Sequence, residues 1–128
     1  MIRILLADDQ PTVRKGLRMR LGLEPGLDIV GEAADGASAV SLARDLAPDI
    51  VLMDVEMPGL DGISATEQLK AEAPGCSVIV LTIHDDAQTR ERARLAGAAA
   101  FVAKQEIDRS LLDAIKSAAA GRDQEGSK

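Results

Sequence analysis

The stretch DIVLMDVEMPG, residues 49–59, decides the fold of this chain. It begins with an apolar run that stops on the carboxylate of Asp54 and then turns at Pro58 and Gly59. Runs of about four to eight apolar residues between breakers are typical of a strand buried on both faces of a parallel sheet. Asp54 is therefore expected at the C-terminal end of such a strand. Ligands of open α/β sheets bind outside those ends, which makes Asp54 the candidate reacting group.

Similar apolar runs and helical patterns alternate on both sides of this stretch. The predicted strands are Ile2–Ala7, Leu27–Ala33, Ile50–Asp54, Val78–Leu81 and Ala98–Ala103, and the predicted helices are Pro11–Leu21, Val40–Ala47, Ile63–Ala73, Asp85–Leu95 and Ile107–Ala119. Five alternations with short connections predict an α/β fold: a single, doubly wound, five-stranded parallel sheet with five helices. Right-handed crossovers favour the flavodoxin-like strand order 2-1-3-4-5, with 27–33 as an exposed edge strand.

Composition narrows the classes of function. The 128 residues contain 46% hydrophobic residues and carry a net charge of −6, so a nucleic-acid surface within this chain is not expected. Cys76 is the only cysteine, which excludes an internal disulfide and cysteine-rich zinc sites. Residues 1–4 lack a signal-peptide pattern, and no apolar run approaches the roughly 18 residues of a membrane span. We expect a cytoplasmic protein without membrane contact.

In the predicted strand order, polar side chains from four strand ends meet at one rim of the sheet. Asp8 and Asp9 follow the first strand, Asp54 ends the third, and Thr82 and Lys104 follow the fourth and fifth. Two unit charges about 4 Å apart repel by roughly 4 kcal/mol at an effective dielectric constant of 20, so three carboxylates need a proton or a cation. Mg²⁺ suits an all-oxygen site that also receives a phosphate.

Such a rim has the parts that phosphoryl transfer requires. A carboxylate such as Asp54 can attack phosphorus and form an acyl phosphate. The ammonium group of Lys104 can pair with phosphoryl oxygens, and the hydroxyl group of Thr82 can hydrogen-bond to one of them.

Four motifs carry a resemblance to a known family. They are Ala7-Asp8-Asp9, residues 53–59 with Asp61-Gly62, Leu81-Thr82, and Gly97 followed by residues 101–104. With these motifs the chain resembles, over nearly its whole length, the CheY-like receiver domain of two-component response regulators. Residues 3–10 and 30–36 are most similar to the NarL/FixJ (LuxR-type) group.

The resemblance implies a function for the rim. Asp54 would accept a phosphoryl group from a sensor histidine kinase. The metal ion would be Mg²⁺, with Mn²⁺ as a substitute, and it would be bound by Asp9, by Asp54 and by the backbone carbonyl of Glu56, with Asp8 acting through water. The protein would then be a signalling switch that catalyses only its own phosphorylation and dephosphorylation, and not an enzyme acting on other substrates.

The resemblance also implies how the signal leaves the site. Thr82 and Phe101 would be the switch pair, and Glu56 and His84 would tune the lifetime of the phosphoryl group. The fourth helix, last strand and last helix would present the signal to a partner or to a second copy in a homodimer. Ordinary roles stay open: Asp8 and Asp9 as turn or cap residues, Phe101 as core and His84 as a surface residue.

The expected organisation is a receiver domain over residues 1–120 and a frayed polar tail over residues 121–128. We interpret the tail as the start of a linker to an output domain that is absent from this chain and through which alone DNA would be bound, in the regulation of transcription. The alternative is a stand-alone, single-domain receiver that acts by protein–protein contact.

Three rival functions remain at this stage. A Mg²⁺-dependent phosphohydrolase would use Asp54 as a turnover nucleophile, but it needs a general acid, and Glu56 stands without the surrounding motif of such enzymes. A flavodoxin-type cofactor binder needs aromatic residues around the flavin, and Phe101 is the chain's only aromatic residue. A pseudo-receiver that works without phosphate would not need all five rim residues.

Overall fold

The computed structural model describes the backbone of residues 1–126 and the side chains of residues 1–121. Strands and α-helices alternate along this part of the chain, and a 3₁₀ turn and a π turn precede the last helix. The bounds are β1 (Ile2–Ala7), α1 (Pro11–Leu21), β2 (Leu27–Ala33), α2 (Gly36–Leu46), β3 (Ile50–Asp54), α3 (Gly62–Glu72), β4 (Ser77–Thr82), α4 (Ala87–Ala96), β5 (Ala100–Ala103), η1 (Lys104–Glu106), η2 (Ile107–Leu111) and α5 (Leu112–Gly126).

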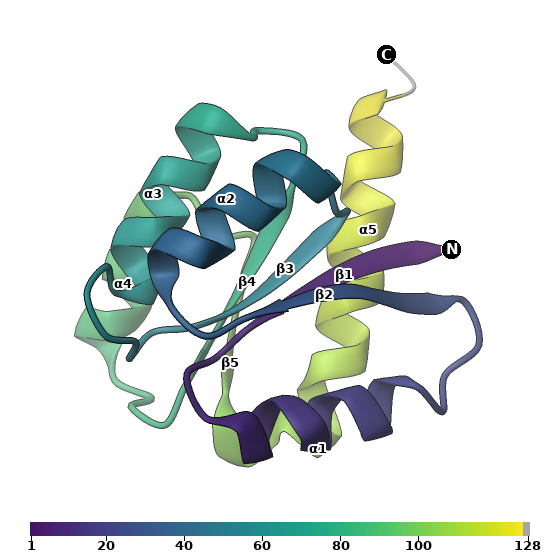
Figure 1. The fold of residues 1–128 in the computed structure, drawn as a ribbon, viewed down its shortest axis with the longest axis horizontal. Helices are drawn as coiled ribbons and strands as arrows, with labels where there is room; N and C mark the ends of the chain where they lie inside the picture. The colour runs from purple at the N-terminus through teal and green to yellow at the C-terminus, as the bar shows by residue number, and fades with distance from the viewer. Residues whose placement is uncertain (127–128) are drawn as a thin grey trace.

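The strands form one parallel, five-stranded sheet in the order β2-β1-β3-β4-β5, which confirms the predicted fold class. β1 and β3 lie side by side, with Leu6 opposite Leu52. β2 lies at an edge of the sheet, as predicted, but most of its residues are half-buried and not exposed. Figure 1 shows α2, α3 and α4 on one face of the sheet and α1 and α5 on the other.

Helices on both faces explain why β3 is apolar at consecutive positions. Val51 and Met53 pack into the layer beneath α2, α3 and α4, whereas Ile50 and Leu52 pack into the layer beneath α1 and α5. Every residue of β3 is buried. Because alternate side chains enter two different cores, the strand shows no alternation of polar and apolar residues.

Several element boundaries differ from the predicted ones: α2 begins at Gly36 and not at Val40, and the ends of α3 and β4 differ by one residue. At the starts of α4 and β5 the difference arises because polar groups nearby satisfy a helix end. Asp86 caps α4 by accepting the backbone N–H of Thr89 at 2.8 Å, so the helix begins at Ala87 and not at Asp85. Ala98 donates its backbone N–H to Ala93 at 3.0 Å, so β5 begins at Ala100 and not at Ala98.

The last helix differs most from its prediction. Residues 107–111, expected as its first turns, form the π turn η2, and α5 begins at Leu112. α5 then continues to Gly126, beyond the predicted end of the last helix at Ala119, and residues 127–128 lie outside the described residues. α5 runs back along the sheet from the C-terminal ends of the strands (Figure 1).

Among the helices within residues 1–126, none combines the length and the apolar character that a membrane crossing requires.

Candidate functional site

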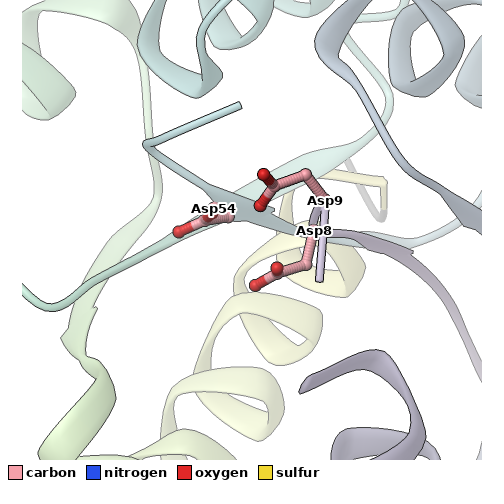
Figure 2. A group of neighbouring side chains, drawn as sticks. All are labelled: Asp8, Asp9 and Asp54. Atoms are coloured by element: carbon pink, nitrogen blue, oxygen red, sulfur yellow. The ribbon is translucent and has the colours of Figure 1, made fainter. Parts of the chain in front are cut away.

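Three carboxylates meet where β1 and β3 end, as predicted from the strand order. We call Asp8, Asp9 and Asp54 the acid cluster. One carboxylate oxygen from each of them lies within 4.8 Å of the others, and Figure 2 shows the three side chains directed into the same space. Asp8 and Asp54 are buried, whereas Asp9 is exposed. The adjacency of β1 and β3 therefore concentrates negative charge in a place that water reaches only in part.

Lys104 partly neutralises this charge. It directly follows β5, and its Nζ atom lies 3.0 Å from Asp8 Oδ2 and 3.1 Å from Asp54 Oδ1. One ammonium group stands against three carboxylates, so an excess of negative charge remains when all are ionised. The site is therefore suited to a further cation.

The pKa of the Asp54 carboxyl group reflects both its burial and this excess of negative charge. Burial raises this pKa from 3.8 to about 6, the Asp8 carboxylate adds to the increase, and the hydrogen bond from Lys104 opposes it. For Lys104, burial lowers the pKa, but the hydrogen bonds to Asp8 and Asp54 outweigh this effect, so the pKa lies above its ordinary value. Lys104 is therefore charged at neutral pH, while Asp54 carries its charge at an energetic cost.

Asp8 and Asp9 are held in different ways. The carboxylate of Asp8 accepts the backbone N–H of Gln10 on Oδ1 at 2.9 Å and Lys104 on Oδ2. In contrast, no hydrogen bond or ion pair within the described residues holds the Asp9 carboxylate. An occupied Asp8 and an available Asp9 support the prediction that Asp9 binds a metal ion directly and that Asp8 acts through water.

A cavity of about 160 Å³ opens beside the acid cluster. Its lining residues are Asp9, Gln10, Asp54, Glu56, Ile83 and Lys104. The acceptors offered there by Asp9, Asp54 and Glu56 are oxygen atoms, which hard cations such as Mg²⁺ prefer. Ile83 is 59% exposed and adds an apolar edge to the cavity. The residues present thus fit Mg²⁺.

The loop after β3 is fixed by close backbone packing. Val55 donates its N–H to Leu81 at 3.0 Å, and its carbonyl group accepts the N–H of Gly62 at 2.9 Å. A Cβ atom on Gly62 would lie 1.9 Å from the carbonyl oxygen of Asp54. Asp61 caps α3 by accepting the N–H of Ser64. The Asp61-Gly62 pair therefore allows α3 to begin directly against the residue that carries the reacting carboxylate.

Thr82 and His84 follow the neighbouring strand. Thr82 is buried, and its hydroxyl oxygen accepts the backbone N–H of His84 at 3.0 Å. The imidazole Nε2 of His84 pairs with the Glu56 carboxylate across the mouth of the site, and both side chains are more than half exposed. The structure therefore brings the two residues expected to tune phosphoryl lifetime into direct contact.

Phe101 lies farther along the sheet, on β5. Its side chain is half-buried, and the guanidinium carbon of Arg90 lies 4.6 Å from the centre of its ring. Arg90 is held in turn by Asp85 at 2.7 Å. The ring therefore packs against α4 and is not part of the acid cluster.

The sequence did not reveal the role of Arg14. From α1, its Nη1 atom donates to the backbone carbonyl of Asp8 at 2.6 Å, and its Nε atom pairs with Glu32 at 3.1 Å. An arginine in the first turns of a helix gives no signal of this kind, because the contact depends on the path of the loop between β1 and α1.

Comparison with known proteins places these features in a family context. Residues 4–116 match the family described as response regulator receiver domain. The chain is 41% identical over 121 residues to the transcriptional regulatory protein LiaR of Bacillus subtilis, a match that covers 94% of this chain and 57% of LiaR. The first curated relatives are matched over 55% to 57% of their lengths, so the chain spans little more than half of them.

Solved structures give the same picture. A LuxR-family two-component response regulator from an Aurantimonas species has a TM-score of 0.89 at 38% identity, covering 94% of this chain and 86% of that one. RcsB from Salmonella enterica serovar Typhimurium, bound to promoter rprA in the presence of the phosphomimetic BeF3−, has a TM-score of 0.82 at 27% identity, covering 91% and 67%.

Proposed function

The chain belongs to the receiver domain family of two-component response regulators, and we propose that it is a phosphorylation-dependent switch in which Asp54 accepts a phosphoryl group from a sensor histidine kinase. Its relatives include transcriptional regulators and a LuxR-family response regulator. The receiver is a signalling module of the kind that governs transcription.

One observation carries the proposal. A buried carboxylate, Asp54, shares a rim with two further carboxylates and with the ammonium group of Lys104. A purely structural Asp at a strand end has no need of this costly arrangement, whereas a nucleophile for phosphorus needs both a nearby cation and a cation site.

The transfer step can be written from these residues. An ionised Asp54 oxygen attacks phosphorus of the kinase's phosphohistidine, a P–O bond forms, the P–N bond breaks, and the released imidazole nitrogen takes a proton from solvent. Mg²⁺, bound by Asp9, Asp54 and the Glu56 carbonyl group with Asp8 acting through water, or Mn²⁺ in its place, would supply charge neutralisation for the phosphoryl oxygens.

Two side chains of the protein would stabilise the product. Lys104 already lies 3.1 Å from Asp54 and would pair with a phosphoryl oxygen. The Thr82 oxygen accepts a hydrogen bond from His84, which leaves the hydroxyl hydrogen free for donation to the phosphoryl group. Movement of Thr82 towards the phosphoryl group would be followed by rotation of Phe101, the second member of the switch pair.

The surface that carries the signal would be the α4-β5-α5 face. Rotation of Phe101 must disturb the contact with Arg90, and this couples the site to α4. The partner at this face would be a second copy of the chain in a homodimer. DNA would be bound only through an output domain joined after the receiver, in line with the promoter-bound structure of RcsB.

Glu56 and His84 would set how long the phosphoryl group lasts. Their side chains pair at the mouth of the site, where a water molecule must enter to attack the acyl phosphate. We place the receiver at residues 1–120 and the start of a linker at residues 121–128, where the chain continues as α5 up to Gly126. A stand-alone receiver remains the alternative organisation.

Phosphorylation with a small donor tests the proposal. The protein is incubated with acetyl phosphate and Mg²⁺, and its intact mass is measured. We expect one added phosphoryl group on the parent protein and on the control Asp28→Asn, which alters an exposed carboxylate on β2, and none on Asp54→Asn. Equal uptake by Asp54→Asn would overturn the assignment. Repeated turnover of a phosphate monoester would instead favour the phosphohydrolase rival.

A further inference from the structure

Arg14 connects three elements around the acid cluster. Its guanidinium group binds Glu32 of β2 and the backbone carbonyl of Asp8, which follows β1, while Arg14 itself belongs to α1. The side chain is only 18% exposed. Charge-assisted hydrogen bonds in such a shielded place are stronger than at an open surface. The ion pair with Glu32 and the packing of α1 thus both fix the Arg14 side chain in the position from which it binds the Asp8 carbonyl group.

An irregularity in the sheet makes the contact possible. The register between β1 and β2 shifts after Ile4, so that Leu6 lies opposite Glu32. Leu6 points into the layer beneath α1 and α5. Because residues paired across a sheet point to the same face, the shift places Glu32 on the side of α1, where it meets Arg14 and Arg18. Without the extra residue, Glu32 would point to the opposite face.

Holding the Asp8 carbonyl also constrains Asp9. The carbonyl group of Asp8 and the N–H group of Asp9 belong to one planar peptide unit. A bond to the carbonyl oxygen therefore limits rotation of the plane that sets the position of the Asp9 Cα atom. No side-chain bond holds the Asp9 carboxylate within the described residues, so its direction depends on the backbone beneath it.

We propose that Arg14 is a positioning residue of the metal site: by fixing the Asp8–Asp9 peptide, it directs the Asp9 carboxylate towards the metal ion. The inference rests on the proposed function, since it assumes that Asp9 binds Mg²⁺. Arg14 itself touches neither the metal ion nor the phosphoryl group. It acts on the site through the main chain.

The charge of Arg14 and its positioning role predict opposite changes in Mg²⁺ affinity when the side chain is replaced. Arg14 is a cation near the acid cluster, so its charge alone disfavours Mg²⁺, and removing that charge would tighten Mg²⁺ binding. Loss of positioning would weaken Mg²⁺ binding instead. Removing hydrogen-bond partners of metal ligands typically costs 10- to 100-fold in metal affinity. The sign of the change therefore separates the two effects.

Arg18 provides a matched control. It pairs with the same Glu32 from the next turn of α1, but it is 49% exposed and makes no contact with Asp8 within the described residues. Arg14→Met and Arg18→Met remove the same charge and the same kind of ion pair. Only Arg14→Met releases the Asp8 carbonyl.

The test is a calorimetric Mg²⁺ titration of the metal-free protein, with no phosphodonor present. We expect Arg14→Met to weaken Mg²⁺ binding by about 10-fold, and Arg18→Met to leave it within about 2-fold or slightly tighter. Arg14→Lys should lie between the parent protein and Arg14→Met, because one ammonium group cannot span Glu32 and the carbonyl together. Circular dichroism and thermal unfolding in EDTA establish the folded fraction of each variant.

The possible results separate the two proposals. Equal Mg²⁺ affinity of folded Arg14→Met and Arg18→Met would overturn the role of Arg14. If Arg14→Met does not fold, Arg14→Lys takes its place, and an affinity equal to that of the parent protein would overturn the role. Absence of Mg²⁺ binding by the parent protein would instead overturn the proposed function. At saturating Mg²⁺, phosphoryl uptake by Arg14→Met should recover to within about 2-fold of the parent rate, since the defect lies in metal affinity.

Discussion

Asp54 is a carboxylate kept in an unfavourable place. It is 4% exposed, it faces Asp8 and Asp9, and Lys104 forms its ion pair. Burial and like charge raise its pKa to about 6. Groups with such shifts concentrate at functional sites, because the free energy lost in folding is recovered when a ligand binds. In the metal-free protein, this residue should therefore lower the stability of the fold.

Removing the charge of Asp54 tests this expectation. In EDTA at pH 7, Asp54→Asn should raise the free energy of unfolding by about 1–3 kcal/mol, since each pKa unit corresponds to about 1.4 kcal/mol. The pKa in the folded state, about 6, lies above 3.8, so the parent protein gains stability as the pH falls from about 6 to 4. The difference between the two proteins should therefore shrink over this range. Urea unfolding at several pH values measures it, and a variant no more stable than the parent at pH 7 would contradict the expectation.

Gly62 shows a second constraint at the scale of one residue. An added Cβ atom would meet the Asp54 carbonyl oxygen at 1.9 Å, whereas a Cβ atom on Gly16 in α1 would meet nothing within 4 Å. Gly62→Ala should therefore destabilise the protein by about 2–3 kcal/mol through overpacking. Gly16→Ala should stabilise it by about 0.5–1 kcal/mol, because alanine is the better helix former. Urea unfolding of both variants measures these changes, and a neutral Gly62→Ala would show that the start of α3 can move.

Among the helices, α4 is notable because the residues that it buries against the sheet are both alanines. Its buried residues are Ala93 and Ala96, whereas α3 buries five residues, among them Ile63 and Leu69. Small side chains bury little apolar surface, so α4 gains less from packing. The sequence is consistent with this weak packing, because residues 85–95 are mostly polar and charged. The contact between Arg90 and Phe101 also connects α4 to β5, and rotation of the Phe101 ring would break it.

Loss of this contact should loosen α4. Arg90→Ala is expected to lower the local stability of the helix by about 0.5–1 kcal/mol, the usual range for an exposed cation–π pair. Amide hydrogen exchange over residues 87–96 should then become about 2- to 5-fold faster. Arg94→Ala is the matched control, since Arg94 pairs with Glu91 on the same helix and is not stacked on the ring. Equal exchange rates in the two variants would show that Arg90 does not restrain α4.

For the whole molecule, the fold and the acid cluster could be predicted because both follow from local patterns. Apolar runs mark buried strands, crossovers order them, and strand ends then bring Asp8, Asp9 and Asp54 together. The contact from Arg14 to the Asp8 carbonyl could not be predicted, since it depends on a loop path and on a register shift in β2. The Glu56–His84 pair likewise requires the relative position of two loops.

The starts of β5 and of the last helix were predicted incorrectly for a similar reason, since they too depend on contacts that the sequence pattern does not show. β5 starts late because the N–H of Ala98 binds a carbonyl group of α4 and not one of the sheet. The π turn over residues 107–111 was predicted as α-helix, because the apolar spacing of these residues is also compatible with a regular α-helix. Periodicity reports which side chains are buried. It does not report which backbone groups pair at the end of an element.

A change in assembly would be the whole-molecule consequence of phosphorylation. In the presence of Mg²⁺ and BeF3−, we expect the parent protein to shift from monomer to dimer, because the α4-β5-α5 face changes when α4 and Phe101 rearrange. Light scattering across a range of protein concentrations measures the shift, with Asp54→Asn as the control that stays monomeric. An unchanged mass with bound BeF3− would direct attention to a partner other than a second copy.

The course of α5 has a consequence for protein engineering. The helix starts near the C-terminal ends of the strands and spans fifteen residues, Leu112–Gly126, so it is about 22 Å long and runs away from the end of the sheet that holds the acid cluster. A reporter protein fused behind it would begin at the far end of the sheet and would leave the mouth of the site open to a phosphodonor. Different fusion partners should therefore be tolerated after α5, because they would lie too far from Asp54 to affect its phosphorylation.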